Sequence, residues 1–80
     1  MHEAKLCLAL LDLAERRLEA AGADRILALD LAVGEWAGVA PEALAAVFPL
    51  CAAGTRAAGA ELRIARVSGR DLVLRELEVT

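Results

Sequence analysis

The chain has 80 residues and a formal net charge of −3 at pH 7, from 9 Lys and Arg against 12 Asp and Glu residues. A chain of this length forms one domain with a modest core, which buries roughly 60–65% of the unfolded surface. The basic residues are scattered and the only aromatic residues are Trp36 and Phe48, so nucleic acid is not an expected partner.

Compartment and membrane association follow from the uncharged runs and the cysteines. The longest uncharged run, residues 43–55, contains a proline and is too short to cross a bilayer. The start of the chain lacks the basic region and cleavage site of a signal peptide. Cys7 and Cys51 form no C-x-x-C pair, which excludes a four-thiolate zinc site and argues against a secreted disulfide scaffold. We expect a cytoplasmic protein without membrane contact, whose cysteines are reduced packing residues.

The first predicted element is a helix over residues 3–21, ended by Gly22. Its apolar residues recur at helical spacing: Leu6, Cys7, Leu10, Leu11, Leu13, Ala14 and Leu18. Leu8 falls on the polar side instead. It is either an ordinary exposed leucine or a contact point for a partner protein.

Residues 25–33 alternate and predict a strand, with Leu27, Leu29, Leu31 and Val33 on its buried face. A glycine-bracketed turn follows over residues 34–38. It lacks the lysine and hydroxyl residue of a phosphate-binding loop.

Trp36 lies at the centre of this turn. Tryptophan packs into cores and is also enriched in protein interfaces. We favour a ring that caps the core, with an exposed partner anchor as the alternative.

Pro41 suits the first position of a second helix, and Glu42 is favoured in its first turn. Pro49 is expected to kink or end this helix, because proline removes a backbone hydrogen bond and clashes with the preceding turn. The apolar side of the helix consists of Leu44, Val47, Phe48 and Cys51.

Residues 61–67 and 72–79 predict two further strands, joined as a tight hairpin with Gly69 and Arg70 at its centre. This register places Leu62 opposite Leu77. It also places Arg63 opposite Glu76, an opposite-charge pair.

The order α-β-α-β-β predicts an α+β fold, with two helices packed on one face of a small three-stranded sheet. The second face of the sheet is only moderately polar. Some of it could be covered by another subunit, so a homodimer is one expected state.

The amino terminus offers a metal chelate. The amine of Met1, the amide nitrogen of His2 and the imidazole Nδ1 of His2 can reach one ion through fused five- and six-membered rings. Three nitrogens in a plane suit Ni(II) or Cu(II) better than Zn(II). The fourth position is open to water, to the carboxylate of Glu3 or to a partner's ligand. Binding should weaken as pH falls through the range of imidazole titration, about 6.5.

The whole chain resembles the HypA/HybF family of hydrogenase nickel chaperones. The resemblance is carried in order by "MHE" at the start, "DLAVGEWAGVAPEAL" (residues 30–44), "AAGTRAAGAELRI" (residues 52–64) and "VSGRDLVLRELEV" (residues 67–79). The order and spacing of these pieces are more specific than any one of them.

The chain departs from the family at one place. Members carry a zinc module of two C-x-x-C pairs between the last two strands, and here that module is absent between residues 64 and 72. Residues 1–80 therefore resemble the nickel-binding domain alone, and no zinc is expected. Functions that depend on the zinc module are in doubt.

The resemblance implies a protein that is not an enzyme and that presents Ni(II) through Met1, His2 and Glu3. The metal would go to the large subunit of [NiFe]-hydrogenase, and in some organisms to urease. A nickel-delivery GTPase or that subunit would contact Lys5 and Leu8. The alternative is a metal-free interaction module or scaffold that keeps the fold and binds a maturation partner.

Overall fold

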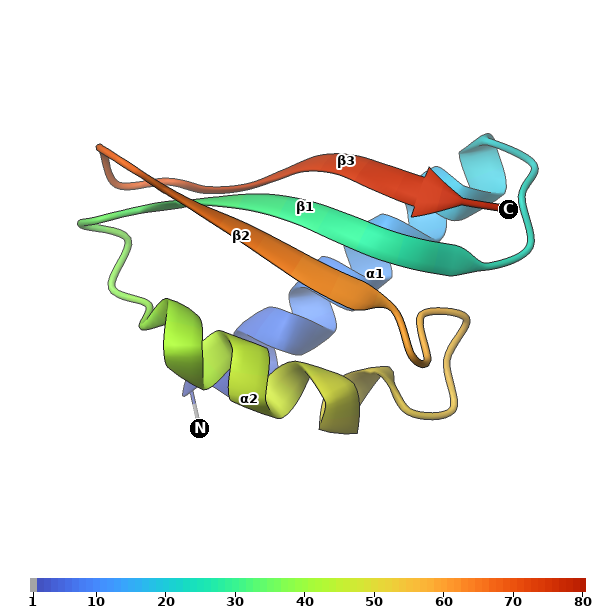
Figure 1. Cartoon of the computed structure of the whole chain (residues 1–80), viewed down its shortest axis with the longest axis horizontal. Helices are drawn as coiled ribbons and strands as arrows, with labels where there is room; N and C mark the ends of the chain where they lie inside the picture. The colour runs from blue at the N-terminus through green and yellow to red at the C-terminus, as the bar shows by residue number, and fades with distance from the viewer. Residues whose placement is uncertain (1) are drawn as a thin grey trace.

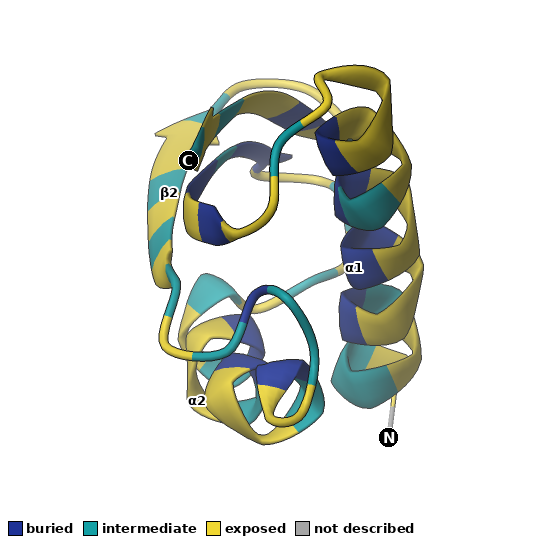
Figure 2. Ribbon diagram, turned by 90° about the vertical axis from the view of Figure 1, so that its right-hand side faces the viewer, coloured by how far each residue is buried: buried dark blue, intermediate teal, exposed yellow. Residues whose placement is uncertain are grey.

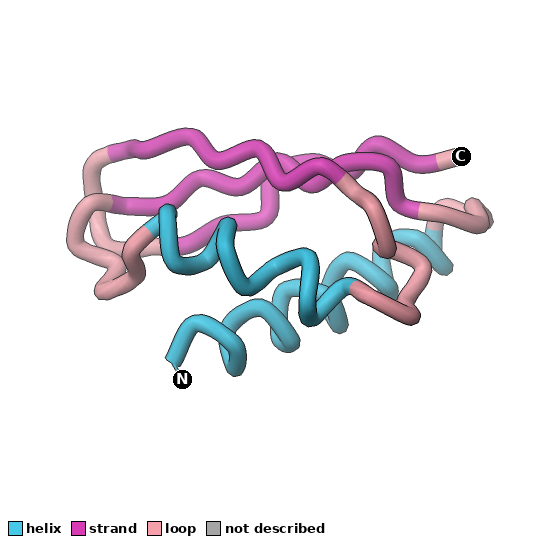
Figure 3. Tube along the Cα trace, turned by 60° about the horizontal axis from the view of Figure 1, so that its bottom comes forward, coloured by secondary structure: helices cyan, strands magenta, loops and turns pink. Residues whose placement is uncertain are grey.

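Two helices lie against one face of a three-stranded sheet in the computed structural model, which describes residues 2–80 (Figure 1). Within these residues the opposite face of the sheet is open (Figure 3). The elements are α1 (His2–Ala20), β1 (Ile26–Gly34), α2 (Pro41–Ala52), β2 (Glu61–Val67) and β3 (Leu72–Val79). The predicted α+β class and the order α-β-α-β-β are confirmed.

One stripe of α1 faces the sheet, as Figure 2 shows along the length of the helix. Its buried residues are Cys7, Leu10, Leu11, Ala14 and Leu18, the spacing of an amphipathic helix. Leu13 was expected in this stripe but is 37% exposed. After the helix, Gly22 has a φ of 67°, a backbone conformation that glycine adopts without strain.

The sheet has the strand order β2-β1-β3, so the predicted hairpin between β2 and β3 is wrong. β1 lies between them, parallel to β2 and antiparallel to β3. Leu62 and Leu77 do share one row of the sheet, but each pairs with Leu29 of the central strand. The hydrophobic pattern correctly predicted that the two leucines lie in one row of the sheet, but it wrongly made β2 and β3 adjacent strands.

The burial of β1 explains its central place. Ala28 and Ala32 are only 1% and 3% exposed on the open face, while Leu29, Leu31 and Val33 are buried against the helices. β2 and β3 instead alternate between half-buried and exposed residues over most of their length. A strand buried on both faces belongs in the middle of a sheet, with the more polar strands at its edges.

The β2–β3 connection passes across the end of β1. The amide of Gly34 donates to the carbonyl of Asp71 (2.8 Å), and that of Trp36 donates to Gly69 (2.9 Å). Strands two places apart are separated by roughly 10 Å. The four residues 68–71 are long enough to span this distance, so they can join β2 to β3 across β1 without the two strands being neighbours.

Two β-bulges alter which side chains face the helices. Between Ile26 and Ala28 the register with β3 shifts by one residue, and Ile26 becomes buried while Leu27 is 47% exposed. Leu27 had been predicted on the buried face, and the extra residue of the bulge is the reason it is not. A second shift follows Asp30, where Arg75 of β3 has no partner in β1.

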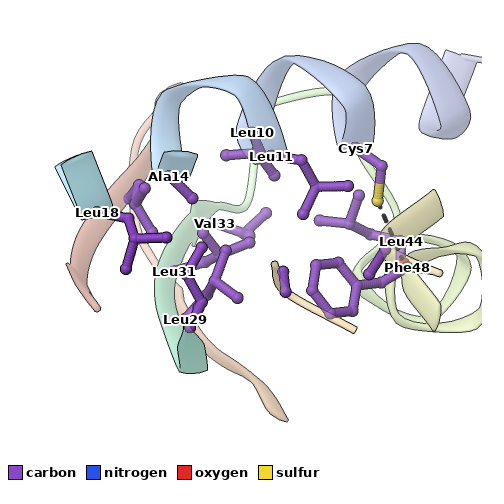
Figure 4. Packing of buried hydrophobic residues seen from close by; sticks show 14 residues of the cluster. Cys7, Leu10, Leu11, Ala14, Leu18, Leu29, Leu31, Val33, Leu44 and Phe48 are labelled. Atoms are coloured by element: carbon purple, nitrogen blue, oxygen red, sulfur yellow. Dashed lines mark hydrogen bonds between the residues drawn. The ribbon is translucent and has the colours of Figure 1, made fainter. Parts of the chain in front are cut away.

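The core is continuous between the helices and β1 (Figure 4). Leu10 and Leu11 point from α1 toward Val33 and Leu31, and the thiol of Cys7 donates to the carbonyl of Leu44 in α2 at 4.0 Å.

α2 continues through Pro49 to Ala52, so the proline does not end the helix. Within residues 2–80, neither helix combines the length and the apolar character needed to cross a membrane.

Candidate metal-binding terminus and exposed anchors

The candidate metal ligands lie where α1 begins. The helix starts at His2, whose side chain is exposed. The amides of the first four residues of an α-helix have no acceptor within the helix, and the His2 amide is one of them. Met1, the remaining predicted ligand, lies outside the described residues. The His2 amide could therefore lose its proton to a metal without breaking a hydrogen bond of the helix.

Glu3 is half-buried in the first turn of α1. A hydrogen bond from its own backbone amide is the main cause that lowers the pKa of its carboxyl, and the charge of His2 lowers it further. The group is thus a carboxylate at neutral pH, close enough to His2 for their charges to interact. An anion in the first turn also interacts favourably with the helix dipole.

Residues 2–80 hold no group of three His, Cys, Asp or Glu side chains placed to bind a metal. Both cysteines are free. Burial raises the pKa of the Cys7 thiol to about 11, and the nearby Cys51 thiol adds to the effect. A protonated, fully buried thiol is a packing group rather than a metal ligand.

Lys5 and Leu8 are both exposed on α1, and Leu8 has 57% of its surface accessible. Residues three apart are neighbours on a helix surface, so the two side chains form one small patch just after the candidate metal-binding terminus.

Trp36 is 73% exposed, so the expectation that its ring caps the core is wrong. Backbone hydrogen bonds hold residues 34–37 against the β2–β3 connection, which leaves the indole directed outward. Ala37 and Val39 pack against the core in its place. The alternative, an exposed ring on a well-anchored turn, describes the structure.

The open face of the sheet carries a charged group that sequence reasoning recognised only in part. Arg63 lies 3.2 Å from both Glu61 and Glu78 and 3.7 Å from Asp30. A hollow of about 520 Å³ adjoins it, lined by Asp30, Leu31, Arg63, Ile64, Ala65, Arg75 and Glu76. The predicted pairing of Arg63 with Glu76 is wrong, because Asp30 of β1 lies between them and pairs with both. The bulge that adds Arg75 to this face left no signal in the sequence.

Known proteins resemble this chain in both sequence and fold. A family model described as "Hydrogenase/urease nickel incorporation, metallochaperone, hypA" matches residues 1–79. The hydrogenase maturation factor HypA of Deinococcus radiodurans is 56% identical over 69 residues, which cover 86% of this chain and 58% of the relative. That of Geobacter sulfurreducens is 44% identical over 70 residues, which cover 88% and 61%. The chain thus spans less than two thirds of the length of these curated relatives.

The fold is shared with the solution structure of the Ni metallochaperone HypA from Helicobacter pylori. The TM-score is 0.73 at 11% sequence identity, over 98% of this chain and 92% of that one. A metallochaperone delivers a metal rather than catalysing a reaction, and the family match covers nearly every residue. The chain belongs to the HypA family of hydrogenase and urease nickel-incorporation metallochaperones.

Proposed function

We propose that this protein carries Ni(II) as cargo for [NiFe]-hydrogenase maturation. It binds the ion through the amine of Met1, and through the amide nitrogen and the Nδ1 of His2. The observation that carries the proposal is the start of α1 at His2. The His2 amide gives up no intrahelical hydrogen bond when it loses its proton to bind the metal.

The electrostatics of the helix end suit a metal that must be released. The N-terminus of a helix carries a partial positive charge, which opposes a cation there. Deprotonation of the His2 amide removes one positive charge from the complex, and the carboxylate of Glu3 supplies a nearby negative charge. Nickel is therefore held with limited affinity, as delivery to a client requires.

Glu3 is the candidate fourth ligand. Its carboxylate already accepts a hydrogen bond from its own backbone amide, so it reaches nickel only by exchanging that bond for the metal. Water or a ligand from the receiving protein can occupy the same position. The fourth coordination position is thus accessible to a ligand from another protein, which favours transfer of the metal.

The receiving partner is a nickel-delivery GTPase or the hydrogenase large subunit in the cytoplasm. It contacts Lys5 and Leu8 beside the terminus, with Trp36 as a second anchor. We also propose that residues 1–80 act without structural zinc, because the connection from β2 to β3 is the cysteine-free segment 68–71.

A nickel titration at neutral pH tests the proposal, with a native, untagged Met1. We expect one bound ion with the absorption band of square-planar nickel, and loss of the band in His2→Ala. A chain whose Met1 amine is acetylated is the matched control, because it keeps His2 and removes the terminal amine as a ligand. If all three proteins bind nickel alike, the terminal chelate is wrong. If the native protein binds no nickel, the metal-free interaction module, which the exposed Trp36 favours, takes its place.

A further inference from the structure

The bulge in β3 places two successive side chains of opposite charge on the open face of the sheet. Asp30 pairs with Glu76 and Leu31 with Leu74, which leaves Arg75 between them without a partner in β1. Successive residues of a regular strand point to opposite faces. Here Arg75 and Glu76 are both exposed and both line the 520 Å³ hollow.

Neither Arg75 nor Glu76 forms an ion pair with another described residue, whereas Arg63 has three carboxylates within 4 Å. Glu76 instead lies directly across from Asp30, and like charges opposite one another on neighbouring strands destabilise a sheet. The open face thus displays a cation and an anion side by side, and neither forms an ion pair with a third residue among those that the structure describes.

An apolar row adjoins these charges. Ala32 pairs with Ala65 on one side and with Val73 on the other, and Val73 is 46% exposed. Interfaces combine an apolar centre with charges at its rim. The open face offers both within neighbouring rows of the sheet.

We propose that this face binds a second copy of the chain, with Arg75 of each copy paired to Glu76 of the other. A two-fold axis that crosses β3 between the two residues brings each arginine onto the opposite glutamate. Only a self-complementary surface allows this, because in a two-fold dimer every contact occurs twice. Two sheets packed face to face lie roughly 10 Å apart, so the long Arg75 side chains enter the hollow. The proposal does not depend on nickel.

Sedimentation equilibrium of the metal-free full chain tests it, from about 10 µM to about 1 mM, since a single three-stranded face makes a small and weak interface. We expect a monomer–dimer equilibrium that weakens with added salt. Arg75→Glu and Glu76→Arg should each raise the dissociation constant at least about tenfold, because each places like charges in contact.

Charge swaps identify the pairing. An equimolar mixture of Arg75→Glu and Glu76→Arg should form heterodimers, and the double variant R75E/E76R should regain the homodimer. Arg16→Glu, a charge reversal on the exposed side of α1, is the matched control and should leave association unchanged. Circular dichroism verifies that each variant is folded.

Three results overturn the proposal: a native chain that stays monomeric to about 1 mM, a dimer that neither single reversal weakens, and a mixture that fails to associate although native chains do. The double variant keeps both charges on the same exposed face, so its loss of association would count against the pairing even if a single variant unfolded.

Discussion

Gly34 lies so close to Gly69 that a Cβ atom on Gly34 would come within 2.5 Å of the Gly69 carbonyl oxygen. The contact joins the end of the central strand to the β2–β3 connection that crosses it, and the hydrogen bond from Trp36 to Gly69 lies beside it. The absence of a side chain at Gly34 therefore lets the β2–β3 connection cross close to the end of β1, beside the turn that carries the exposed tryptophan.

Gly34→Ala should destabilise the protein by about 2–4 kcal/mol, because backbone on both sides must move to admit the methyl group. Urea denaturation followed by circular dichroism measures the loss. Gly38→Ala is the control. Gly38 has a φ of 77° and open space around it, so only conformational strain of about 1 kcal/mol applies. Equal losses in the two variants would show that the contact with Gly69 is unimportant.

Local pattern predicted the elements of this fold, and pairing depended on facts that local pattern lacks. Periodicity placed the first helix, the start of the second helix and all three strands within about two residues of their bounds, whereas Pro49 left the end of the second helix undecided. The hairpin failed because a short connection with Gly69 suits a tight turn as well as a crossing over β1. The choice was made by the two-sided burial of β1, whose Ala28 and Ala32 looked like surface positions.

The candidate site likewise contains residues that local sequence could predict and residues that it could not. His2 remains a prediction made from its place beside the amino terminus, since the proposed chelate needs only neighbouring atoms of the chain. Sequence reasoning missed or misplaced Leu27, Trp36 and Arg75, because β-bulges and backbone hydrogen bonds set the direction of their side chains. These features depend on contacts between segments far apart in the sequence, which residue spacing does not encode.

Cys7 should make the protein less stable in alkali. Its pKa is raised to about 11 in the folded chain from a reference value of 9.0, so the folded state keeps a proton that the unfolded state loses. The stabilisation is complete below about pH 9 and is lost as pH rises toward 11. Thermal unfolding from pH 8 to 11 measures this, and Cys7→Ala should lack that part of the decline. Identical profiles would mean that the buried thiol plays no part.

Arg63→Ala should cost about 1 kcal/mol or more, because it leaves Asp30, Glu61 and Glu78 without their shared cation. Added salt should reduce the loss by screening the remaining carboxylates. Arg16→Ala breaks a single exposed pair with Asp12 within α1 and should cost only about 0.3–0.5 kcal/mol. Urea midpoints at low and high salt distinguish the two. A salt-independent loss at Arg63 would contradict an electrostatic origin.

Trp36→Ala should change stability by less than about 0.5 kcal/mol, because the ring is 73% exposed and Ala37 and Val39 fill the core beside it. Trp36 is the only tryptophan, so intrinsic fluorescence reports on it alone. The native emission should already be that of an indole in water and should shift little on unfolding. A blue-shifted emission with a stability loss of several kcal/mol would show that the ring is buried in the core and would contradict the prediction. If emission and stability behave as expected, the chain bears an exposed tryptophan that its own fold does not need. That outcome would agree with the proposed role of Trp36 as a partner anchor, because tryptophan is enriched among the residues that contribute most to binding.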